Sequence, residues 1–238
     1  MLLELNGVTK SFGGLVAVNN LQFSVEKGDV IGLIGPNGSG KTTSFNLISG
    51  HLSPDEGRIL FNGMDITGLK THNICHRGIA RTFQLTKPFG GMTAMQNVMV
   101  GKLYGGNPPE SLSKAENACS RLLEFVGLEG KESVMAHTFG TVDRKRLEIA
   151  RALATEPELL LLDEMMSGLT HAEMEQALKL VKAISDSGIT LIVVEHVMKA
   201  ILNVSTKLVV LNYGEKIAEG KPQEVVDNKK VIDAYLGE

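Results

Sequence analysis

The sequence predicts an α/β fold with an antiparallel β-portion near its start, a parallel-stranded core and a helical insertion. Apolar and polar residues alternate along residues 2–5 and 21–25, which is typical of half-buried antiparallel strands. Farther along, nearly continuous apolar strands alternate with helical segments, which indicates parallel pairing because each crossover passes over a face of the sheet. Between these parts, from about residue 90 to residue 153, the pattern is helical with no clear strand.

The individual elements follow from the same patterns. An apolar strand over residues 30–34 ends at Gly35 and is followed by a helix over residues 41–48. Residues 57–62 form a further short strand. Helical spacing marks the segments 94–103, 114–126 and 144–154. Strands return at 159–162 and 190–194, and helices over 172–186 and 197–203 follow them.

Composition narrows the class of protein. A net charge of −3 argues against nucleic-acid binding as the main task, since such proteins usually present a strongly basic face. Cys75 and Cys119 stand apart rather than in a C-x-x-C pair, and no signal peptide is recognised, so we expect small buried thiols in a reducing cytosol. No apolar run approaches the roughly 18 to 20 residues of a membrane helix, so any transport role would depend on a membrane partner.

A glycine-rich loop follows the strand over residues 30–34 and matches the phosphate-binding pattern G-x-x-x-x-G-K-[ST] without gaps. Its candidate nucleotide-binding residues are Gly35, Pro36, Asn37, Gly38, Ser39, Gly40, Lys41, Thr42 and Thr43. Glycines let successive backbone N–H groups converge on phosphate oxygens, and the following helix directs its positive dipole end at the same charge. We expect Lys41 to reach the β- and γ-phosphates and the Thr42 hydroxyl to ligate Mg²⁺.

Two carboxylates end the apolar strand over residues 159–162. Asp163 and Glu164 lie where open α/β sheets bind ligands, at the C-terminal end of a central strand. Asp163 suits the Mg²⁺ shell, and Glu164 could polarise the attacking water. A strand that ends in Asp-Glu is common in isolation, but together with the phosphate loop it indicates a nucleotide hydrolase.

Two further polar residues are assigned to the site by their spacing. Gln84 follows the apolar-rich residues 79–83, and His196 follows the strand over 190–194 and Glu195. A polar residue just past a strand end can face the γ-phosphate. Either one alone is better explained as a surface or satisfied polar residue, and it is their spacing against the other motifs that favours the site. The absence of an Asn-Lys-x-Asp guanine pattern and the presence of Glu164 with His196 argue against an ordinary P-loop kinase or GTPase.

With these four elements in order, the chain resembles ABC transporter ATPase subunits over essentially its whole length, and most of all those of branched-chain amino-acid importers. The narrower resemblance depends on the segments SFGGLVAV (11–18), RTFQ (81–84), LEIARAL (147–153) and AYLGE (234–238). It implies one P-loop ABC-type ATPase domain over residues 1–238, with a core of 1–89 and 155–238 and a helical subdomain of 90–154.

The resemblance also implies roles for single residues. Phe12 would stack on adenine with Val18 beside it, although as a bare sequence feature Phe12 would more often be a core residue. Gln84 would link Mg²⁺ to the membrane partner, and His196 would be the switch histidine near the γ-phosphate. With Glu164, these two form the expected catalytic set, while Thr42, Gln84 and Asp163 are the expected metal ligands.

ATP and Mg²⁺ are the implied cofactors. The implied partners are transmembrane permease subunits, a second ATPase subunit (a copy of this chain or a paralogue) and, indirectly, a substrate-binding protein, with no nucleic acid. The chain would lie peripherally at the cytoplasmic face of the membrane. Urea, amides and other amino acids remain open as cargo. The alternative is a soluble ABC ATPase acting on nucleic acid or ribosomes, which would usually carry coiled-coil arms, duplicated cassettes or basic extensions.

The chain departs from the family pattern in the signature segment, defined here as residues 139–143. Counted without gaps, Gly140 replaces the serine of Leu-Ser-Gly-Gly-Gln, Val142 the second glycine and Asp143 the glutamine, whereas a two-residue slip would make Gly140 the signature glycine. Asp143 would compete with a partner's nucleotide for the helix N-terminus and could cap that helix. The basic run at 144–146 either offsets this charge or forms a solvated helix face. Met165 and Thr170 also replace the family's usual proline and aspartate or asparagine.

Overall fold

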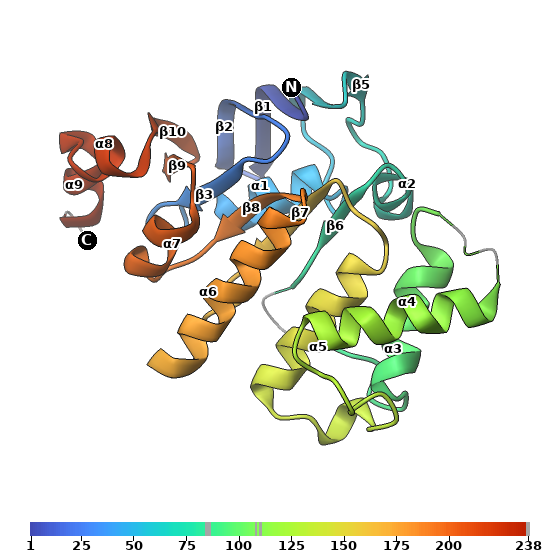
Figure 1. The fold of residues 1–238 in the computed structure, drawn as a ribbon. Coiled ribbons are helices and arrows are strands. Elements are labelled where there is room, and N and C mark those ends of the chain that lie inside the picture. The colour runs from blue at the N-terminus through green and yellow to red at the C-terminus, as the bar shows by residue number, and fades with distance from the viewer. Residues whose placement is uncertain (84–86, 108, 110, 237–238) are drawn as a thin grey trace.

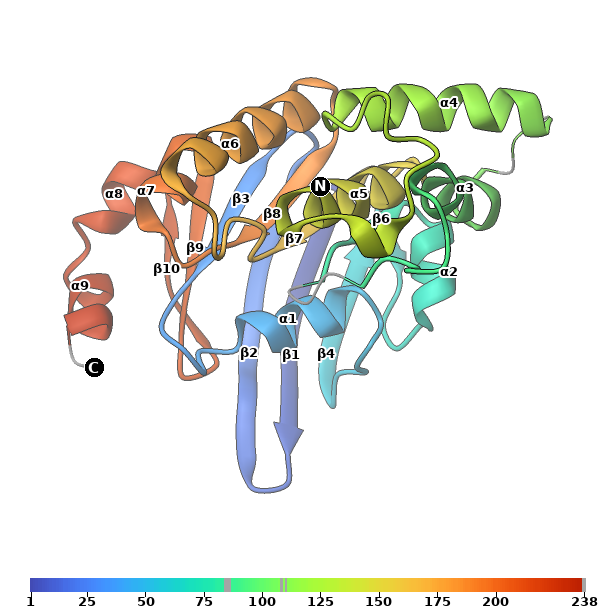
Figure 2. The same cartoon turned by 90° about the horizontal axis from the view of Figure 1, so that it is seen from below.

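A computed structural model describes residues 1–83, 87–107, 109 and 111–236, which fold around two β-sheets (Figure 1). The smaller sheet is antiparallel where its register is assigned and has the strand order β2-β1-β4-β5. Its strands are β1 (Leu3–Phe12), β2 (Leu15–Val25), β4 (Glu56–Phe61) and β5 (Met64–Asp65). The first two form a long hairpin that projects beyond helix α1 (Lys41–Ile48), as Figure 2 shows.

The larger sheet has the order β10-β9-β3-β8-β7-β6. Its strands are β3 (Val30–Ile34), β6 (Ile79–Arg81), β7 (Leu159–Asp163), β8 (Thr190–Val194), β9 (Lys207–Asn212) and β10 (Glu215–Gly220). All neighbours pair in parallel except β10, which is antiparallel to β9. The α/β fold class and its antiparallel N-terminal portion are therefore confirmed, whereas β5, β9 and β10 were not predicted.

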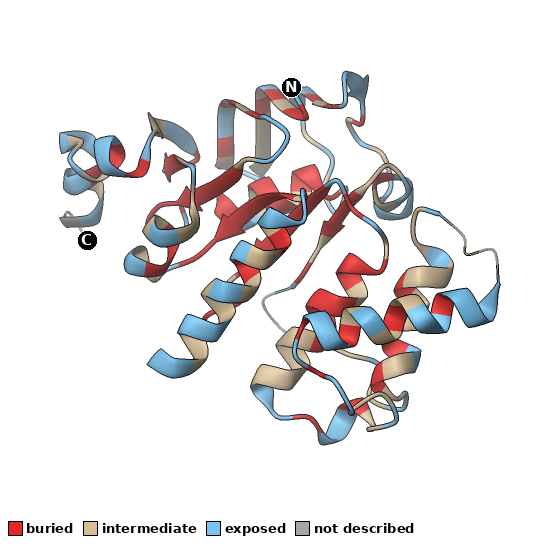
Figure 3. Ribbon diagram, in the orientation of Figure 1, coloured by how far each residue is buried: buried red, intermediate tan, exposed pale blue. Residues whose placement is uncertain are grey.

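The central strands of the larger sheet are buried on both faces (Figure 3). Successive residues of β7 point to opposite sides, so that Leu160 and Leu162 contribute to one hydrophobic core while Leu159 and Leu161 contribute to the other. Continuous apolar runs are typical of parallel strands covered on both faces. The sheet is consequently a rigid base for the loops that follow its strands.

Helices cover both faces of this base. Outside the predicted insertion they are α1, α2 (Thr71–His76), α6 (His171–Asp186), α7 (Met198–Val204), α8 (Pro222–Val226) and α9 (Lys229–Leu236). Among the described residues, none of the helices combines the length and the apolar character needed to span a membrane.

The segment predicted to be helical contains α3 (Ala94–Tyr104), α4 (Leu112–Phe125), the short 3₁₀-helix η1 (Ala136–Thr138) and α5 (Thr141–Leu153), which lie together on one side of the molecule (Figure 1). Thr93 starts α3 with a capping box, in which its side chain and that of Gln96 each accept a hydrogen bond from the other's backbone N–H. Helix α5 begins three residues before its predicted start, because Gly140 in extended conformation is its N-cap.

Candidate nucleotide-binding and hydrolysis site

The strand order brings the predicted site residues to one edge of the larger sheet. Strands β3, β8, β7 and β6 are consecutive neighbours and run parallel, so their C-terminal ends meet there. The phosphate loop follows β3, His196 follows β8, Glu164 follows β7 and Phe83 follows β6. Ligands of open α/β sheets bind at this edge. Gln84 lies outside the described residues.

The phosphate loop has a backbone shape that requires glycine at two positions. Gly35 has φ 147° and Gly40 has φ 103°, both in the region that side chains disfavour. A Cβ atom at Gly35 would lie 2.0 Å from the carbonyl oxygen of Leu211, and one at Gly40 would lie 2.6 Å from that of Ala17. The loop is thus packed closely against neighbouring backbone, and any side chain at these two positions would displace it.

Lys41 starts α1 and turns back over the loop. Its Nζ donates hydrogen bonds of 2.7 Å to the carbonyl oxygens of both Gly35 and Pro36, and it is buried. Ser39 is also buried, Thr43 is partly exposed, and the next residue after the lysine, Thr42, is exposed. The ammonium therefore lies at the centre of the loop, and the threonine hydroxyl is accessible at its rim.

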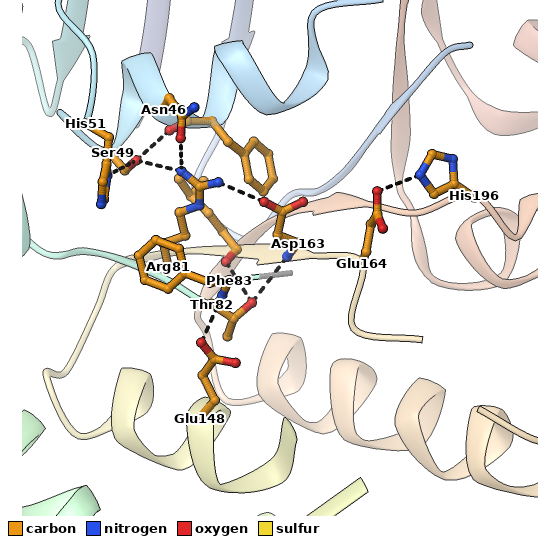
Figure 4. Close-up of polar contacts among 12 residues, drawn as sticks. Asn46, Ser49, His51, Arg81, Thr82, Phe83, Glu148, Asp163, Glu164 and His196 are labelled. Atoms are coloured by element: carbon orange, nitrogen blue, oxygen red, sulfur yellow. Dashed lines mark hydrogen bonds and ion pairs between the residues drawn. The ribbon is translucent and has the colours of Figure 1, made fainter. Parts of the chain in front are cut away.

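The predicted catalytic carboxylate and histidine are in direct contact. Nε2 of His196 and Oε1 of Glu164 lie 2.6 Å apart (Figure 4). Glu164 has φ 48°, an uncommon value for a residue other than glycine, and its backbone N–H donates to the carbonyl oxygen of Val194 at 2.9 Å. This bond to the end of β8 holds Glu164 in a conformation that directs its side chain toward His196.

Asp163 is buried and ion-paired with Arg81, a residue for which the sequence predicts no role. The guanidinium Nη2 lies 2.8 Å from Oδ2 of Asp163, and the two side chains are 7% and 4% exposed. The backbone N–H of Asp163 donates to Oγ1 of Thr82 at 3.2 Å. The only signal in the sequence is an arginine at the end of an apolar strand, which does not reveal its partner.

Two buried glutamates lie close to these residues. Glu148 on α5 accepts a hydrogen bond of 3.0 Å from the backbone N–H of Phe83 (Figure 4), and burial raises the pKa of its carboxyl to about 7. Glu195 accepts a hydrogen bond of 2.7 Å from the backbone N–H of Met166, and burial again raises its pKa to about 7, against the opposing effects of that bond and of Lys145. Neither glutamate was predicted to contribute to the site.

These pKa values make stability depend on pH. Between an unfolded value near 4.5 and a folded value near 7, the folded chain keeps a proton on Glu195 that the unfolded chain has lost, so the free energy of unfolding falls as pH rises through this window. Glu195→Gln is expected to remove roughly 1 to 3 kcal/mol of that fall. Urea unfolding at pH 5.5 and 7.5 measures the difference in the free energy of unfolding between these pH values. If this difference is the same in the variant as in the wild type, the raised pKa of Glu195 is contradicted.

The predicted adenine contacts differ in exposure. Phe12, at the end of β1, is 47% exposed, and Nζ of Lys10 lies 5.8 Å from the centre of its ring. Phe12 is therefore not a core residue, and its ring is accessible to a base. Val18 is fully buried, so in this conformation its side chain does not reach the surface that Phe12 presents.

Phe12→Ala is expected to weaken ATP and GTP binding by similar factors, because stacking on a ring reads little of the base edge. The expected loss is roughly 1 to 3 kcal/mol, the range for base–aromatic stacking. Titration calorimetry with both nucleotides measures it, with Leu15→Ala on the facing strand of the same hairpin as the control. Unchanged ATP affinity in the Phe12 variant would exclude the stacking role.

Comparison with known proteins agrees with this geometry. Residues 18–167 match the family described as ABC transporter, and residues 215–238 match one described as branched-chain amino acid ATP-binding cassette transporter. The chain belongs to the ABC transporter family. It is 38% identical to the high-affinity branched-chain amino acid transport ATP-binding protein BraF of Pseudomonas aeruginosa, over 100% of this chain and 98% of that protein.

Solved ABC cassettes share the whole fold of this ABC ATPase. A nucleotide-free ATP-binding cassette from an ABC transporter superimposes with a TM-score of 0.90 at 33% identity, covering 100% of this chain and 99% of the other. A dimeric cassette in a post-hydrolysis state, bound to ADP and phosphate, superimposes with a TM-score of 0.84 at 25% identity, covering 93% and 99%. The recognition of an ABC ATPase subunit from its sequence motifs is therefore confirmed.

The signature segment of this ABC ATPase differs from expectation in how its charges are arranged. The N-cap of α5 is Gly140, which makes no side-chain cap, so the expectation that Asp143 caps the helix is wrong. Oδ2 of Asp143 instead lies 2.5 Å from Nζ of Lys131, in an ion pair that the sequence did not indicate. The acidic charge that was expected to compete with a partner's nucleotide for the helix N-terminus thus has a basic neighbour.

The basic run at residues 144–146, which follows Asp143, is not a freely solvated helix face. Arg144 donates to the carbonyl oxygen of His137 at 2.8 Å, and Arg146 donates to Oε1 of Gln176 on α6 at 2.7 Å. Lys145 donates to the carbonyl oxygens of Met165 at 3.0 Å and Ser167 at 2.7 Å. The run therefore joins α5 to the segment after Glu164 and to helix α6.

Proposed function

We propose that this ABC ATPase powers the uptake of branched-chain or related amino acids through a membrane permease. The observation that carries the proposal is its similarity to BraF over the full length of the chain, which includes the separate match at residues 215–238. The net charge of −3 is consistent with a partner other than nucleic acid.

In the proposed reaction, the loop N–H groups and Lys41 hold the phosphates of ATP. Glu164 orients and polarises the attacking water, and the contact with His196 holds its carboxylate in place while the histidine senses the γ-phosphate. Gln84 is proposed to face the same phosphate from the neighbouring loop. Among the described residues, Lys41, Glu164 and His196 follow neighbouring strands whose ends meet at one edge of the sheet, which supports these roles.

The residues at this edge fit a magnesium ion. Thr42 and Asp163 line one cavity, so that a hydroxyl and a carboxylate oxygen are available together. Mg²⁺ prefers oxygen ligands, and is commonly held by one or two protein groups together with the phosphates of the nucleotide. We propose that these two residues, with Gln84, hold the ion, which neutralises charge on the phosphates when bound.

We also propose which function each part of the chain, and each partner subunit, has in the assembled transporter. Residues 1–89 and 155–238 form the nucleotide-binding core, and residues 90–154 form a helical subdomain that contacts the permease at the cytoplasmic face of the membrane. A second ATPase subunit, either a copy of this chain or a paralogue, closes over the nucleotide, in keeping with the dimeric cassette that the fold resembles. A substrate-binding protein would act only through the permease.

The experiment is ATP-driven uptake into vesicles. The chain is purified with the membrane subunits that accompany it and reconstituted, and accumulation of radiolabelled leucine, valine, alanine and urea is measured with ATP or ADP on the side of the ATPase. The proposal expects ATP-dependent leucine or valine accumulation. The vesicles are also supplied with the accompanying substrate-binding protein. Accumulation of none of the three amino acids, in vesicles that hydrolyse ATP, would then refute the amino-acid assignment while leaving the ATPase assignment intact.

The signature segment leads to a prediction about asymmetry. In the ungapped alignment this chain offers a partner no serine hydroxyl at residue 140, and losing one charge-assisted hydrogen bond costs about 1.5 to 3 kcal/mol, enough to slow a step tenfold or more. Gly140→Ser, combined with Val142→Gly and Asp143→Gln, is expected to raise the ATPase rate of the isolated subunit. The Cβ of a serine fits, because no atom lies within 4 Å of its position and φ is −68°.

The control is Gly91→Ala, at another glycine whose added Cβ meets nothing within 4 Å and whose φ is not positive. In a complex with a paralogue that carries an intact signature, Lys41→Ala in this chain is expected to be more harmful than the matching change in the paralogue. Rapid cooperative hydrolysis by the unmodified homodimer, without any gain on restoration, would contradict the asymmetry. It would mean that Thr141 and the N–H groups of α5 suffice.

A further inference from the structure

Arg81 joins the phosphate-loop helix to the strand that carries Asp163. Its Nη1 donates to Oδ1 of Asn46 at 2.7 Å and to Oγ of Ser49 at 3.2 Å, and both acceptors belong to α1 or its C-cap. Its Nη2 donates to Oδ2 of Asp163, at the end of β7, at 2.8 Å. Figure 4 shows the guanidinium between these groups, with one side facing the helix and the other facing the carboxylate.

Two aromatic rings complete the surroundings of this guanidinium. The ring centres of Phe45 on α1 and Phe83 after β6 lie 5.5 Å and 5.1 Å from the Cζ atom of Arg81. Guanidinium groups stack on aromatic faces, and their planar fork holds several acceptors in one fixed geometry. The side chain of Arg81 is only 7% exposed. The group is therefore held as a rigid bridge rather than as a mobile surface cation.

The bridge connects the two elements that carry the proposed magnesium ligands. Thr42 lies in the first turn of α1, and Asp163 ends β7, while Arg81 contacts both elements from β6, next to β7. We propose that Arg81 is a positioning residue, which fixes the carboxylate of Asp163 relative to α1 and thereby sets the affinity of the nucleotide complex for Mg²⁺. This inference rests on the proposed function, in which Thr42 and Asp163 hold the ion.

The opposite possibility is that Arg81 competes with the ion for Asp163. The enclosure of the guanidinium argues against it, because leaving the carboxylate would break the contacts with Asn46, Ser49 and both rings as well. Removing one partner of a buried ion pair is strongly destabilising because it leaves an uncompensated buried charge, so without Arg81 the carboxylate of Asp163 would no longer be held in its present position. The bridge therefore orients Asp163, and its removal is expected to weaken binding of the ion rather than strengthen it.

The test compares ADP affinity with and without the ion. The full chain is titrated with ADP by calorimetry in excess MgCl₂ and in EDTA, and the ratio of the two affinities is the contribution of Mg²⁺. Arg81→Met is expected to leave the EDTA affinity within about threefold of wild type and to lower the ratio about tenfold, the size of one lost charge-assisted hydrogen bond. Mn²⁺ binding to the ADP complex, followed by electron paramagnetic resonance, should weaken in parallel.

Matched variants show whether the effect of Arg81 on Mg²⁺ affinity comes from its geometry, from its charge or from an effect on folding. Arg81→Lys keeps the charge but lacks the planar fork, and it is expected to remain defective by about threefold or more. Asn46→Ala, which removes one neutral contact on the helix side, is expected to lower the ratio in the same direction. Combined with Arg81→Met it should add nothing further, since both changes break one bridge. Lys27→Met, in the exposed ion pair with Glu158, is the control and should behave as wild type.

The outcomes distinguish this inference from the proposed function. If the wild-type chain binds ADP with the same affinity in MgCl₂ and in EDTA, the proposed metal site is refuted. A wild-type dependence on Mg²⁺ that Arg81→Met and Asn46→Ala leave unchanged, or that Arg81→Met increases, would overturn the positioning role alone. Full restoration by lysine would also overturn it, because charge without geometry would then suffice. If Arg81→Met does not fold, Asn46→Ala and Arg81→Lys decide between these outcomes.

Discussion

Replacing Glu164 with glutamine is expected to lower ATP hydrolysis by the assembled ATPase about 100-fold or more, while ATP remains bound. The glutamine has nearly the same shape, so it can keep a hydrogen bond to His196, but it cannot accept a proton from the attacking water. Because Asp163 and the phosphate loop are unchanged, the variant should accumulate as an ATP-bound dimer.

Gel filtration with multi-angle light scattering, with and without ATP, measures this accumulation. Glu175→Gln, which neutralises an exposed carboxylate on α6, is the matched control and should hydrolyse ATP as the wild type does. Hydrolysis at the wild-type rate by the Glu164 variant would show that another group orients the water.

Lys41→Ala is expected to prevent productive ATP binding by lowering the affinity about 30- to 100-fold, because the change removes the cation that we propose to face the phosphates. The change also removes the hydrogen bonds from Nζ to Gly35 and Pro36, so the loop loses part of its own support. Titration of the full chain with ATP measures the affinity, and Lys182→Ala on the exposed face of α6 is the control. ATP affinity within threefold of wild type would exclude the loop as the phosphate site.

Local patterns predicted those parts of the fold that depend on neighbouring residues. The strands β3 and β8 and the helix α1 have the predicted bounds, because a continuous apolar run, or a glycine-rich loop followed by a helix, signals its own ends. The same holds for the phosphate loop, whose glycines are required by positive φ at Gly35 and Gly40. Strands β9 and β10 were not predicted, although residues 208–211 form an equally clear apolar run.

Contacts between distant segments could not be predicted in this way. Arg81 and Asp163 are 82 positions apart, and they meet only because β6 pairs with β7 in a register that periodicity does not encode. Likewise, Lys131 neutralises Asp143 because the loop before η1 returns to the start of α5. The burial of Val18, which belongs to β2 of the hairpin, has the same origin, since the pattern of a strand does not reveal which face another element covers.

Phosphate release in a single turnover shows whether ATP is hydrolysed at the site that we propose around Lys41, Asp163 and Glu164. The assembled complex is mixed with less than one equivalent of ATP per site, and free phosphate is followed for the wild type and for Glu164→Gln in this chain. We expect rapid release from the wild type and retained ATP in the variant. Equal release from both would contradict hydrolysis at this site.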